Sequence, residues 1–284
     1  YPILITIACE INLSFKESFI MNINGDKAAL VTGASHGIGL ELAKILLSDG
    51  WVVYGTGRDV SSLEDTKALF PRFVPIQSDF TRNSDIELVA RVIKDSGIPL
   101  HLSVQNAGMK SPPRPLTQYD CDSIDEVFQV NLLAPMKLTA LLASQMPVAS
   151  RILFVTSRAA TLKLKESSTY CASKAGLDEV TAIARKELAE NNIGVSCVIP
   201  GEVDTQIQKT LRETTSFYLH KMFDEAYQTG QLISPKTCAE FLKWFLCDLS
   251  FDEFRQSNMP VSIYEEWHHP FWLKDKSQLP PFPF

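Results

Sequence analysis

Residues 27–47 place a glycine-rich turn between a buried strand and a helix. Residues 27–31 (KAALV) are apolar without alternation, which predicts a short buried strand. The turn follows at residues 32–39 (TGASHGIG), and residues 40–47 (LELAKILL) carry an apolar stripe at helical spacing. Since the N-terminus of a helix presents free N–H groups to an anion, this order predicts a phosphate-binding loop of the dinucleotide-binding kind.

The glycines of this loop have separate functions. Such a loop needs a tight turn, a close approach of the backbone to the pyrophosphate, and close packing of helix on strand. The spacing is Gly-x-x-x-Gly-x-Gly, which differs from the Gly-x-Gly-x-x-Gly of the general dinucleotide fingerprint. We expect the whole turn to line a cofactor site, with contributions from Gly33, Ser35, His36, Gly37, Ile38 and Gly39.

A second motif joins a phenol to an amine. Tyr170 and Lys174 are four residues apart, so on a helix they lie on one face, one turn above the other. An ammonium near a tyrosine hydroxyl favours the phenolate and is expected to lower the pKa of Tyr170 toward the working pH. Such a group suits the interconversion of a carbonyl and an alcohol. The spacing also occurs by chance on solvated helices, so neighbouring motifs decide its meaning.

Together the two motifs resemble the short-chain dehydrogenase/reductase family in its compact form. Further matches follow in the family's order: residues 105–108 (QNAG) resemble its Asn-Asn-Ala-Gly with the first residue changed, and Asn131 resembles its helix asparagine. Ser157 ends the predicted strand 152–156 and precedes Tyr170 by thirteen positions (157 to 170), which is the family spacing. Residues 200–205 (PGEVDT) are similar to its Pro-Gly-x-x-x-Thr turn, so the resemblance covers roughly residues 27–265.

The resemblance implies a role for each matching residue. Tyr170 would donate the proton, Ser157 would hydrogen-bond the same substrate oxygen, and Lys174 would bind the nicotinamide ribose. Asn131 would hold a water that links the lysine to solvent, or would be a structural amide. Cofactor contacts are expected around adenine from Asp79 and Phe80, on the adenosine side from Asn106, Ala107 and Gly108, and around nicotinamide from Val203 and Thr205. Pro200 and Gly201 are expected to bind the cofactor as well.

The end of the second predicted strand, residues 51–56, bears on the choice of cofactor. A carboxylate there binds the ribose diol of NAD, whereas a guanidinium forks onto the 2′-phosphate of NADP. Arg58 follows Gly57, so we expect NADPH, with His36 assisting. In the competing interpretation Asp59 binds the ribose of NADH and Arg58 is a solvated surface charge.

Alternating strand and helix patterns predict one open α/β sheet, mostly parallel and doubly wound in the Rossmann manner, in a single domain. We expect this domain over residues 21–266, with a helical substrate lid over 206–230. Residues 1–20 are expected to be a disordered or non-native extension, with Met21 as a plausible start. Residues 267–284 are expected to form a Pro-rich tail.

Composition excludes several classes of partner. A net charge of −6 argues against nucleic acid and anionic membrane surfaces. Six cysteines without ligand spacing indicate reduced thiols in a cytoplasmic protein, and Cys171 is expected to be a packing residue. Adjacent His268 and His269 lack further ligands, so no metal site is predicted. The family resemblance implies a homodimer or homotetramer through two long helices, around residues 123–143 and 168–189.

The lid carries the information about substrate. Its apolar and aromatic residues favour a bulky apolar or aromatic carbonyl, unless they only pack the lid; they are Leu211, Phe217, Tyr218, Met222, Phe223 and Tyr227. Residues 204–216 and 230–232 are similar to the sepiapterin reductase and benzil reductase branch, which implies an NADPH-dependent ketone or dicarbonyl reductase. Glu202 and Glu265 are candidate polar anchors. The alternatives are an NAD-dependent alcohol or hydroxysteroid dehydrogenase, a nucleotide-sugar epimerase, and a non-enzymatic NADP sensor.

Overall fold

The computed structural model describes residues 26–282, so the predicted extension 1–20 lies outside the described residues. Its centre is a seven-stranded sheet in the order β3-β2-β1-β4-β5-β6-β7, and every neighbouring pair is parallel. This confirms the predicted doubly wound sheet. The strands are β1 (Ala28–Val31), β2 (Val52–Gly57), β3 (Phe73–Gln77), β4 (Leu100–Gln105), β5 (Arg151–Val155), β6 (Gly194–Ile199) and β7 (Val261–Ser262).

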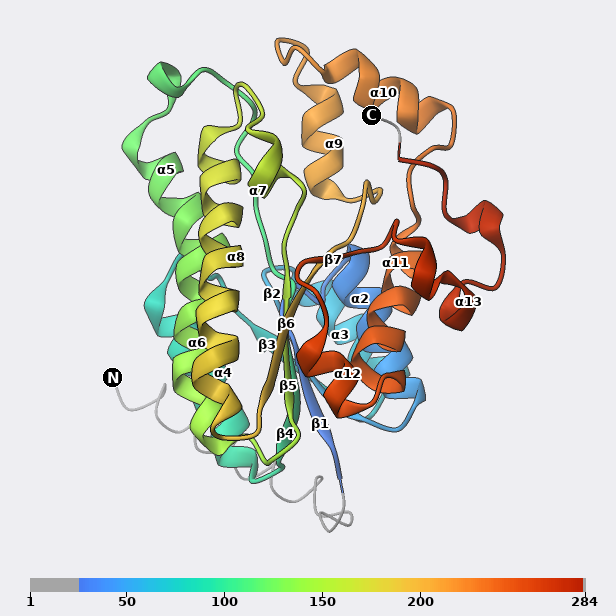
Figure 1. Cartoon of the computed structure of the whole chain (residues 1–284). Helices are drawn as coiled ribbons and strands as arrows, with labels where there is room; N and C mark the ends of the chain where they lie inside the picture. The colour runs from blue at the N-terminus through green and yellow to red at the C-terminus, as the bar shows by residue number, and fades with distance from the viewer. Residues whose placement is uncertain (1–25, 283–284) are drawn as a thin grey trace.

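Helices cover both faces of the sheet (Figure 1). One face carries α2 (Gly37–Ser48), α3 (Val60–Leu69), α11 (Pro235–Lys243) and α12 (Phe251–Gln256). The other carries α4 (Asn83–Ser96), α8 (Ser168–Ala189), and the continuous run α5 (Cys121–Phe128), π-helical Gln129–Leu133 and α6 (Ala134–Leu142). Smaller elements are α7 (Ala159–Leu162), α9 (Gln206–Glu213), α10 (His220–Gln228), α13 (His269–Trp272), π-helical Trp244–Asp248, and 3-10 turns at Leu116–Gln118, Ala143–Gln145, Glu266–His268 and Lys276–Gln278.

The strands are apolar on both sides because each face is buried beneath helices. Along β1, Ala29 and Val31 pack into one core with α2 and α11, whereas Ala28 and Leu30 pack into the other with α4, α6 and α8. The two cores lie on opposite sides of the sheet. This explains why the strands read as unbroken apolar runs in the sequence.

The strand order places a binding crevice. From β1 the chain runs outward through β2 to β3 and then returns to β4 on the other side of β1. In such sheets ligands bind beyond the carboxyl ends of the strands where the order reverses. Here that point lies between β1 and β4, which end directly before the glycine loop and before Asn106.

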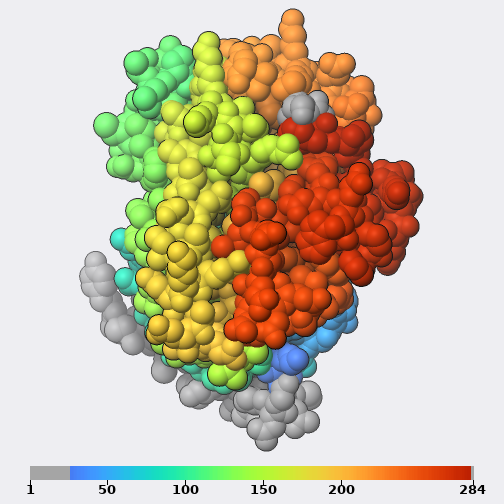
Figure 2. Space-filling model, in the orientation of Figure 1, coloured from blue at the N-terminus to red at the C-terminus, as the bar shows by residue number. Residues whose placement is uncertain are grey.

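The lid lies above this end of the sheet as α9 and α10 (Figure 1). Space-filling Figure 2 shows these orange residues beside the red C-terminal segment, at one end of the molecule. Residues 267–273, which the sequence analysis assigns to a tail, begin with structured turns and pack on the domain. His268 is fully buried and Trp272 is 8% exposed within the core on the α2 and α11 side, because their rings fill a cluster around Phe241 and Trp244.

One helical run, Cys121–Gln145, is long and apolar enough to cross a membrane by length and composition alone. In the fold, 44% of the most apolar 18-residue stretch of this run is buried. The run packs beside α4 and α8 on the sheet. Core packing therefore explains the buried apolar residues of this run, such as Leu138 and Leu142, whereas Leu133 and Met136 are exposed.

Candidate active site

The glycine loop has the backbone that the predicted phosphate site requires. Gly33 and Gly37 adopt φ values of +70° and +60°, in the left-handed region that favours glycine. A Cβ on Gly39 would lie 2.2 Å from the carbonyl oxygen of Gly33, so only glycine fits there. His36 precedes α2 without capping it through its side chain, which leaves the N–H groups of the first turn available to an anion.

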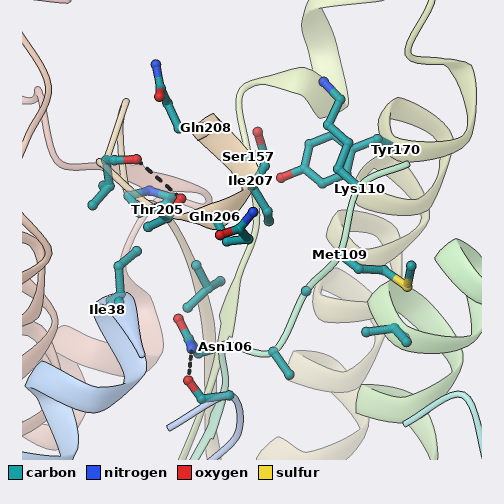
Figure 3. Close-up of a pocket in the computed structure, with 18 of the residues that line it drawn as sticks. Ile38, Asn106, Met109, Lys110, Ser157, Tyr170, Thr205, Gln206, Ile207 and Gln208 are labelled. Atoms are coloured by element: carbon teal, nitrogen blue, oxygen red, sulfur yellow. Dashed lines mark hydrogen bonds between the residues drawn. The ribbon is translucent and has the colours of Figure 1, made fainter. Parts of the chain in front are cut away.

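Two polar side chains hold this loop against the end of β4. The Asn106 amide donates to the carbonyl oxygens of Thr32 at 2.9 Å and Gly33 at 3.4 Å. In return, the Thr32 hydroxyl accepts the backbone N–H groups of Asn106 and Ala107, both at 2.9 Å. Asn106 thus helps to fix the shape of the loop, and Figure 3 shows a dashed hydrogen bond from its amide. Sequence matching alone does not reveal this function.

Arg58 and Asp59, the alternative predicted contacts at the adenosine ribose, have different environments after the end of β2. Asp59 caps α3, where its carboxylate accepts the N–H of Ser62 at 3.3 Å. Arg58 is exposed and borders the cavity beside Ser35 and His36. Asp59 thus has one carboxylate oxygen engaged at the start of α3, whereas Arg58 borders the cavity.

The two residues predicted to contact adenine, Asp79 and Phe80, follow the end of β3. Asp79 is tied into a turn, where its carboxylate accepts the Thr81 N–H at 3.1 Å and the Thr81 hydroxyl at 2.8 Å. Its own N–H donates to Asp85 at 2.8 Å. Phe80 is 6% exposed, and both residues border the cavity. This part of the site is held rigidly by its own hydrogen bonds.

Ser157 and Tyr170 bring their hydroxyls into one space. Ser157 lies just beyond β5 and Tyr170 on α8, and Figure 3 shows both oxygens directed into the cavity. Burial raises the pKa of Tyr170 to about 12, and Ser157 offsets this shift only in part. The direction is opposite to the sequence expectation, because desolvation of the phenolate outweighs any help from Lys174.

Lys174 lies one turn beyond Tyr170, as expected. Its Nζ donates to the carbonyl oxygen of Val155 at 2.8 Å and lies 5.9 Å from the centre of the Tyr170 ring. Burial lowers the pKa of Lys174 to about 8, while Asp178 acts in the opposite direction. The ammonium is therefore anchored to β5 and only neighbours the phenol.

Asn131 lies in the π-helical turn and binds a neighbouring loop. Its amide accepts the N–H of Met109 at 2.8 Å and donates to the Met109 carbonyl at 2.9 Å. It also donates to the Ser173 hydroxyl at 3.1 Å. Since these bonds use both ends of the amide, the geometry supports the structural alternative stated above, with the side chain supporting the cavity from behind.

The turn after β6 carries the residues predicted to lie near nicotinamide. Gly201 has φ +83°, and a Cβ there would meet Ile233 at 2.6 Å. Val203 pairs with Ile233 in an isolated bridge, and Thr205 directly precedes α9. The turn thereby leads the chain from the sheet into the lid.

One cavity collects almost all of the predicted site residues. Gly39 and Asn131 are the two that do not border it, and both act by packing or hydrogen bonding behind its wall. The remainder border it together: Gly33, Ser35, His36, Gly37, Ile38, Arg58, Asp79, Phe80, Asn106, Ala107, Gly108, Ser157, Tyr170, Lys174, Pro200, Gly201, Val203 and Thr205. From the lid come Leu211, Met222 and Phe223, whereas Tyr218 and Tyr227 face solvent.

The sequence analysis missed Lys110 and Arg158, which also border the cavity. The sequence signal for Lys110 is its position, two residues after Gly108 in the segment predicted to line the cofactor site. Glu202, one candidate anchor, does face the cavity. Glu265, the other, is satisfied elsewhere by the N–H of Ser262 at 2.9 Å and the Trp267 indole at 2.8 Å.

The adjacent histidines are used in folding. Trp272 donates to Nδ1 of His268 at 2.8 Å, and the other ring nitrogen of His268 contacts the Ser262 carbonyl at 3.0 Å. His269 contacts the Ile263 carbonyl at 2.8 Å. Within residues 26–282, no group of three His, Cys, Asp or Glu side chains gathers as a metal site would require.

The family model of the short chain dehydrogenases matches residues 27–216. With the fold and the cavity described above, this places the chain in the short-chain dehydrogenase/reductase family. Within it, the chain has relatives in the benzil reductase branch, as its lid sequence predicts.

Two of these relatives are benzil reductases that form (S)-benzoin. The protein of Saccharomyces cerevisiae is 33% identical over 233 residues, covering 76% of this chain and 88% of the relative. The protein of Bacillus subtilis is 29% identical, covering 72% and 87%. A solved short chain dehydrogenase from Burkholderia cenocepacia in complex with NADP has a TM-score of 0.68 and 26% identity, covering 84% of this chain and 95% of the other.

Proposed function

We propose that the protein is an NADPH-dependent reductase that converts a ketone or dicarbonyl to an alcohol. The observation that carries this proposal is the meeting of the Ser157 and Tyr170 hydroxyls in the same cavity as the glycine loop and Lys174. Similarity to two benzil reductases and to an NADP complex supports it.

The proposed chemistry divides between cofactor and protein. Bound NADPH supplies the hydride, and the protein supplies orientation, a proton and hydrogen bonds. Tyr170 donates its hydroxyl proton to the carbonyl oxygen, and Ser157 donates a hydrogen bond that stabilises the charge developing there. With its pKa raised to about 12, Tyr170 is a protonated donor throughout the neutral range. In this proposal Lys174, which is held by the Val155 carbonyl, binds the ribose hydroxyls.

The proposed preference for NADPH rests on Arg58, and the proposed binding of a dinucleotide rests on the glycine loop. The glycine loop fits a dinucleotide for two reasons. The backbone packs so closely at Gly39 that a side chain would collide with the Gly33 carbonyl, and the His36 side chain leaves the N-terminus of α2 uncapped for an anion. Exposed Arg58 suits the 2′-phosphate, since Asp59 is used as a helix cap.

The function is tested by following NADPH and NADH oxidation with aromatic ketones, diketones and pterins. We expect turnover with NADPH on at least one diketone, and a lower kcat/KM with NADH. The variant Tyr170→Phe serves as the background for each substrate. Absence of turnover across the panel would favour the sensor alternative, and equal use of NADH would favour the NAD-dependent dehydrogenase.

A further inference from the structure

We propose that Lys110 binds the second carbonyl oxygen of a neutral vicinal dicarbonyl and so selects 1,2-diketones over simple ketones. This inference rests on the proposed reductase function and specifies its substrate class. Neither the phosphate loop nor the proposed catalytic groups require a cation at this position.

Lys110 lies directly beside the proposed proton donor. Its Nζ is 5.1 Å from the centre of the Tyr170 ring and 5.7 Å from that of Phe217 in the lid. Figure 3 shows the lysine lying across Tyr170, with its amine beyond the ring on the side away from Asn106. A substrate whose first oxygen is bound by Tyr170 and Ser157 would therefore have Lys110 at its flank.

The ammonium has hydrogen-bonding capacity left for a ligand. Within the described residues, Nζ contacts the Tyr170 and Phe217 rings, and no hydrogen bond or ion pair joins it to a protein acceptor. An ammonium carries three N–H donors, and leaving donors unpaired in a half-buried site is unfavourable. A carbonyl oxygen about 2.8 Å away would satisfy one of them.

Glu202 gives this subsite its preference for a neutral ligand. It borders the same cavity, and its charge counteracts the desolvation that lowers the pKa of Lys110 to about 8. Burial raises the pKa of Glu202 to about 7, while Lys110 and Arg158 lower it. Near neutral pH Glu202 is therefore partly ionised, and its ionised form favours the charged form of Lys110 and repels an anionic 2-oxo acid. A diketone is accommodated without this repulsion.

The backbone before Lys110 is fixed in place. Asn131 binds both the N–H and the carbonyl of Met109, at 2.8 and 2.9 Å. These two bonds lock the residue that precedes Lys110 to the helical layer containing α8, because Asn131 also binds Ser173. Asn131 is thereby a positioning residue for the Lys110 subsite.

Lys110 transfers nothing in the proposed reaction. The hydride reaches the first carbonyl carbon, and the proton of Tyr170 reaches its oxygen, giving a hydroxyketone and oxidised cofactor. Lys110 only donates a hydrogen bond to the second oxygen, which holds the substrate in one orientation. It therefore contributes mainly to binding and orientation. We expect its removal to raise KM more than it lowers kcat.

The experiment compares benzil with deoxybenzoin, which has the same skeleton without one carbonyl oxygen. In Lys110→Met we expect the ratio of kcat/KM for benzil to that for deoxybenzoin to fall about 10-fold or more relative to wild type, as for a lost hydrogen bond to a charged group. Lys165→Met, on the exposed surface, is the matched control and should keep the wild-type ratio. Because the diketone is intrinsically more reactive with both proteins, comparing the ratio between variant and wild type cancels this effect.

Two further variants sharpen the result. Lys110→Arg retains a cation and should recover part of the benzil preference, while NADPH binding and thermal melting verify that each variant folds. Glu202→Gln should raise the kcat/KM for phenylglyoxylate relative to benzil.

An unchanged benzil-to-deoxybenzoin ratio in Lys110→Met overturns the inference while ketone reduction itself stands. Failure of the wild type to reduce any carbonyl overturns the proposed function.

Discussion

The ammonium of Lys174 donates a hydrogen bond of 2.8 Å to the carbonyl oxygen of Val155, the last residue of β5. This bond ties α8 to the strand that ends two residues before Ser157. Since Tyr170 lies one turn from Lys174 on the same helix, the bond fixes all three proposed catalytic groups relative to one another. Fixed geometry of this kind is what proton donation to a bound carbonyl requires.

Tyr170→Phe should abolish most of the turnover and leave NADPH binding intact. The substitution removes the only proposed proton donor, and general acid catalysis contributes about 10²–10⁴-fold to rate. Steady-state NADPH oxidation and cofactor fluorescence measure the two effects. Tyr218→Phe makes the same change on an exposed lid residue and should have wild-type kinetics. Full activity in Tyr170→Phe would remove this residue from the mechanism.

Arg58→Ala should raise the KM for NADPH about 10–100-fold, as expected for loss of a charge-assisted contact to phosphate. The KM for NADH should change little, because NADH lacks the 2′-phosphate. Parallel titrations with both cofactors make the comparison. Arg91→Ala removes an exposed guanidinium from α4 and serves as the control. Equal effects on the two cofactors would argue against a phosphate contact.

The sequence predicted the frame of the molecule well, because that frame depends on local patterns. The expected strand 195–199 appears as Gly194–Ile199, and 152–156 appears as Arg151–Val155. Apolar runs mark strands buried on both faces, and the turn residues that follow them mark the ends of those strands. Motif residues at strand ends then converge because parallel strands end at one edge of the sheet.

Sequence could not give the environment of each side chain. The raised pKa of Tyr170 depends on desolvation by segments far away in the chain, among them the loop of Lys110. Lys110 itself is ordinary in sequence and becomes notable only where the lid brings Phe217 over it. Likewise, periodicity did not distinguish Met222, which borders the cavity, from Tyr227, which faces solvent.

Gly39→Ala should weaken NADPH binding strongly and lower the melting temperature. The added Cβ would lie 2.2 Å from the Gly33 carbonyl oxygen and 2.6 Å from the Asn106 amide, so the loop must move. Overpacking costs about 1–3 kcal/mol. Gly50→Ala is the comparison: it has φ +85° but meets no atom within 4 Å, so it reports backbone strain alone. If both variants bind NADPH equally, the close approach is not required.

We expect the protein to form a homodimer or homotetramer through α8 and the run α5–α6. Three apolar side chains there are exposed in the single chain, at 38% for Leu133, 39% for Met136 and 47% for Ile183. Ile183→Glu should therefore shift the mass measured by light scattering toward the monomer. Leu69→Glu, on α3 and 72% exposed, should leave it unchanged. A monomeric wild type would contradict the prediction.

His268 should make the fold sensitive to acid. It is fully buried, and burial lowers its pKa to about 4 from an ordinary value of 6.5. Above pH 6.5 the ring is neutral in both states and its contribution to stability is complete. Between pH 6.5 and 4 the unfolded chain takes up a proton that the folded chain does not, so the free energy of unfolding falls by up to about 3 kcal/mol.

The measurement is urea unfolding between pH 7.5 and 4.5 for wild type and His268→Gln. Carboxylates contribute to the acid dependence of both proteins, so the difference in slope isolates the histidine. The variant should be less stable at pH 7.5, because the hydrogen bond from Trp272 and the stacking on Phe241 change, and its stability should fall less as the pH drops. His101→Gln is the comparison, since it removes a histidine outside this cluster, where the ring contacts the Pro99 carbonyl and the edge of Trp51. Identical slopes for wild type and His268→Gln would show that His268 is not held neutral by the fold.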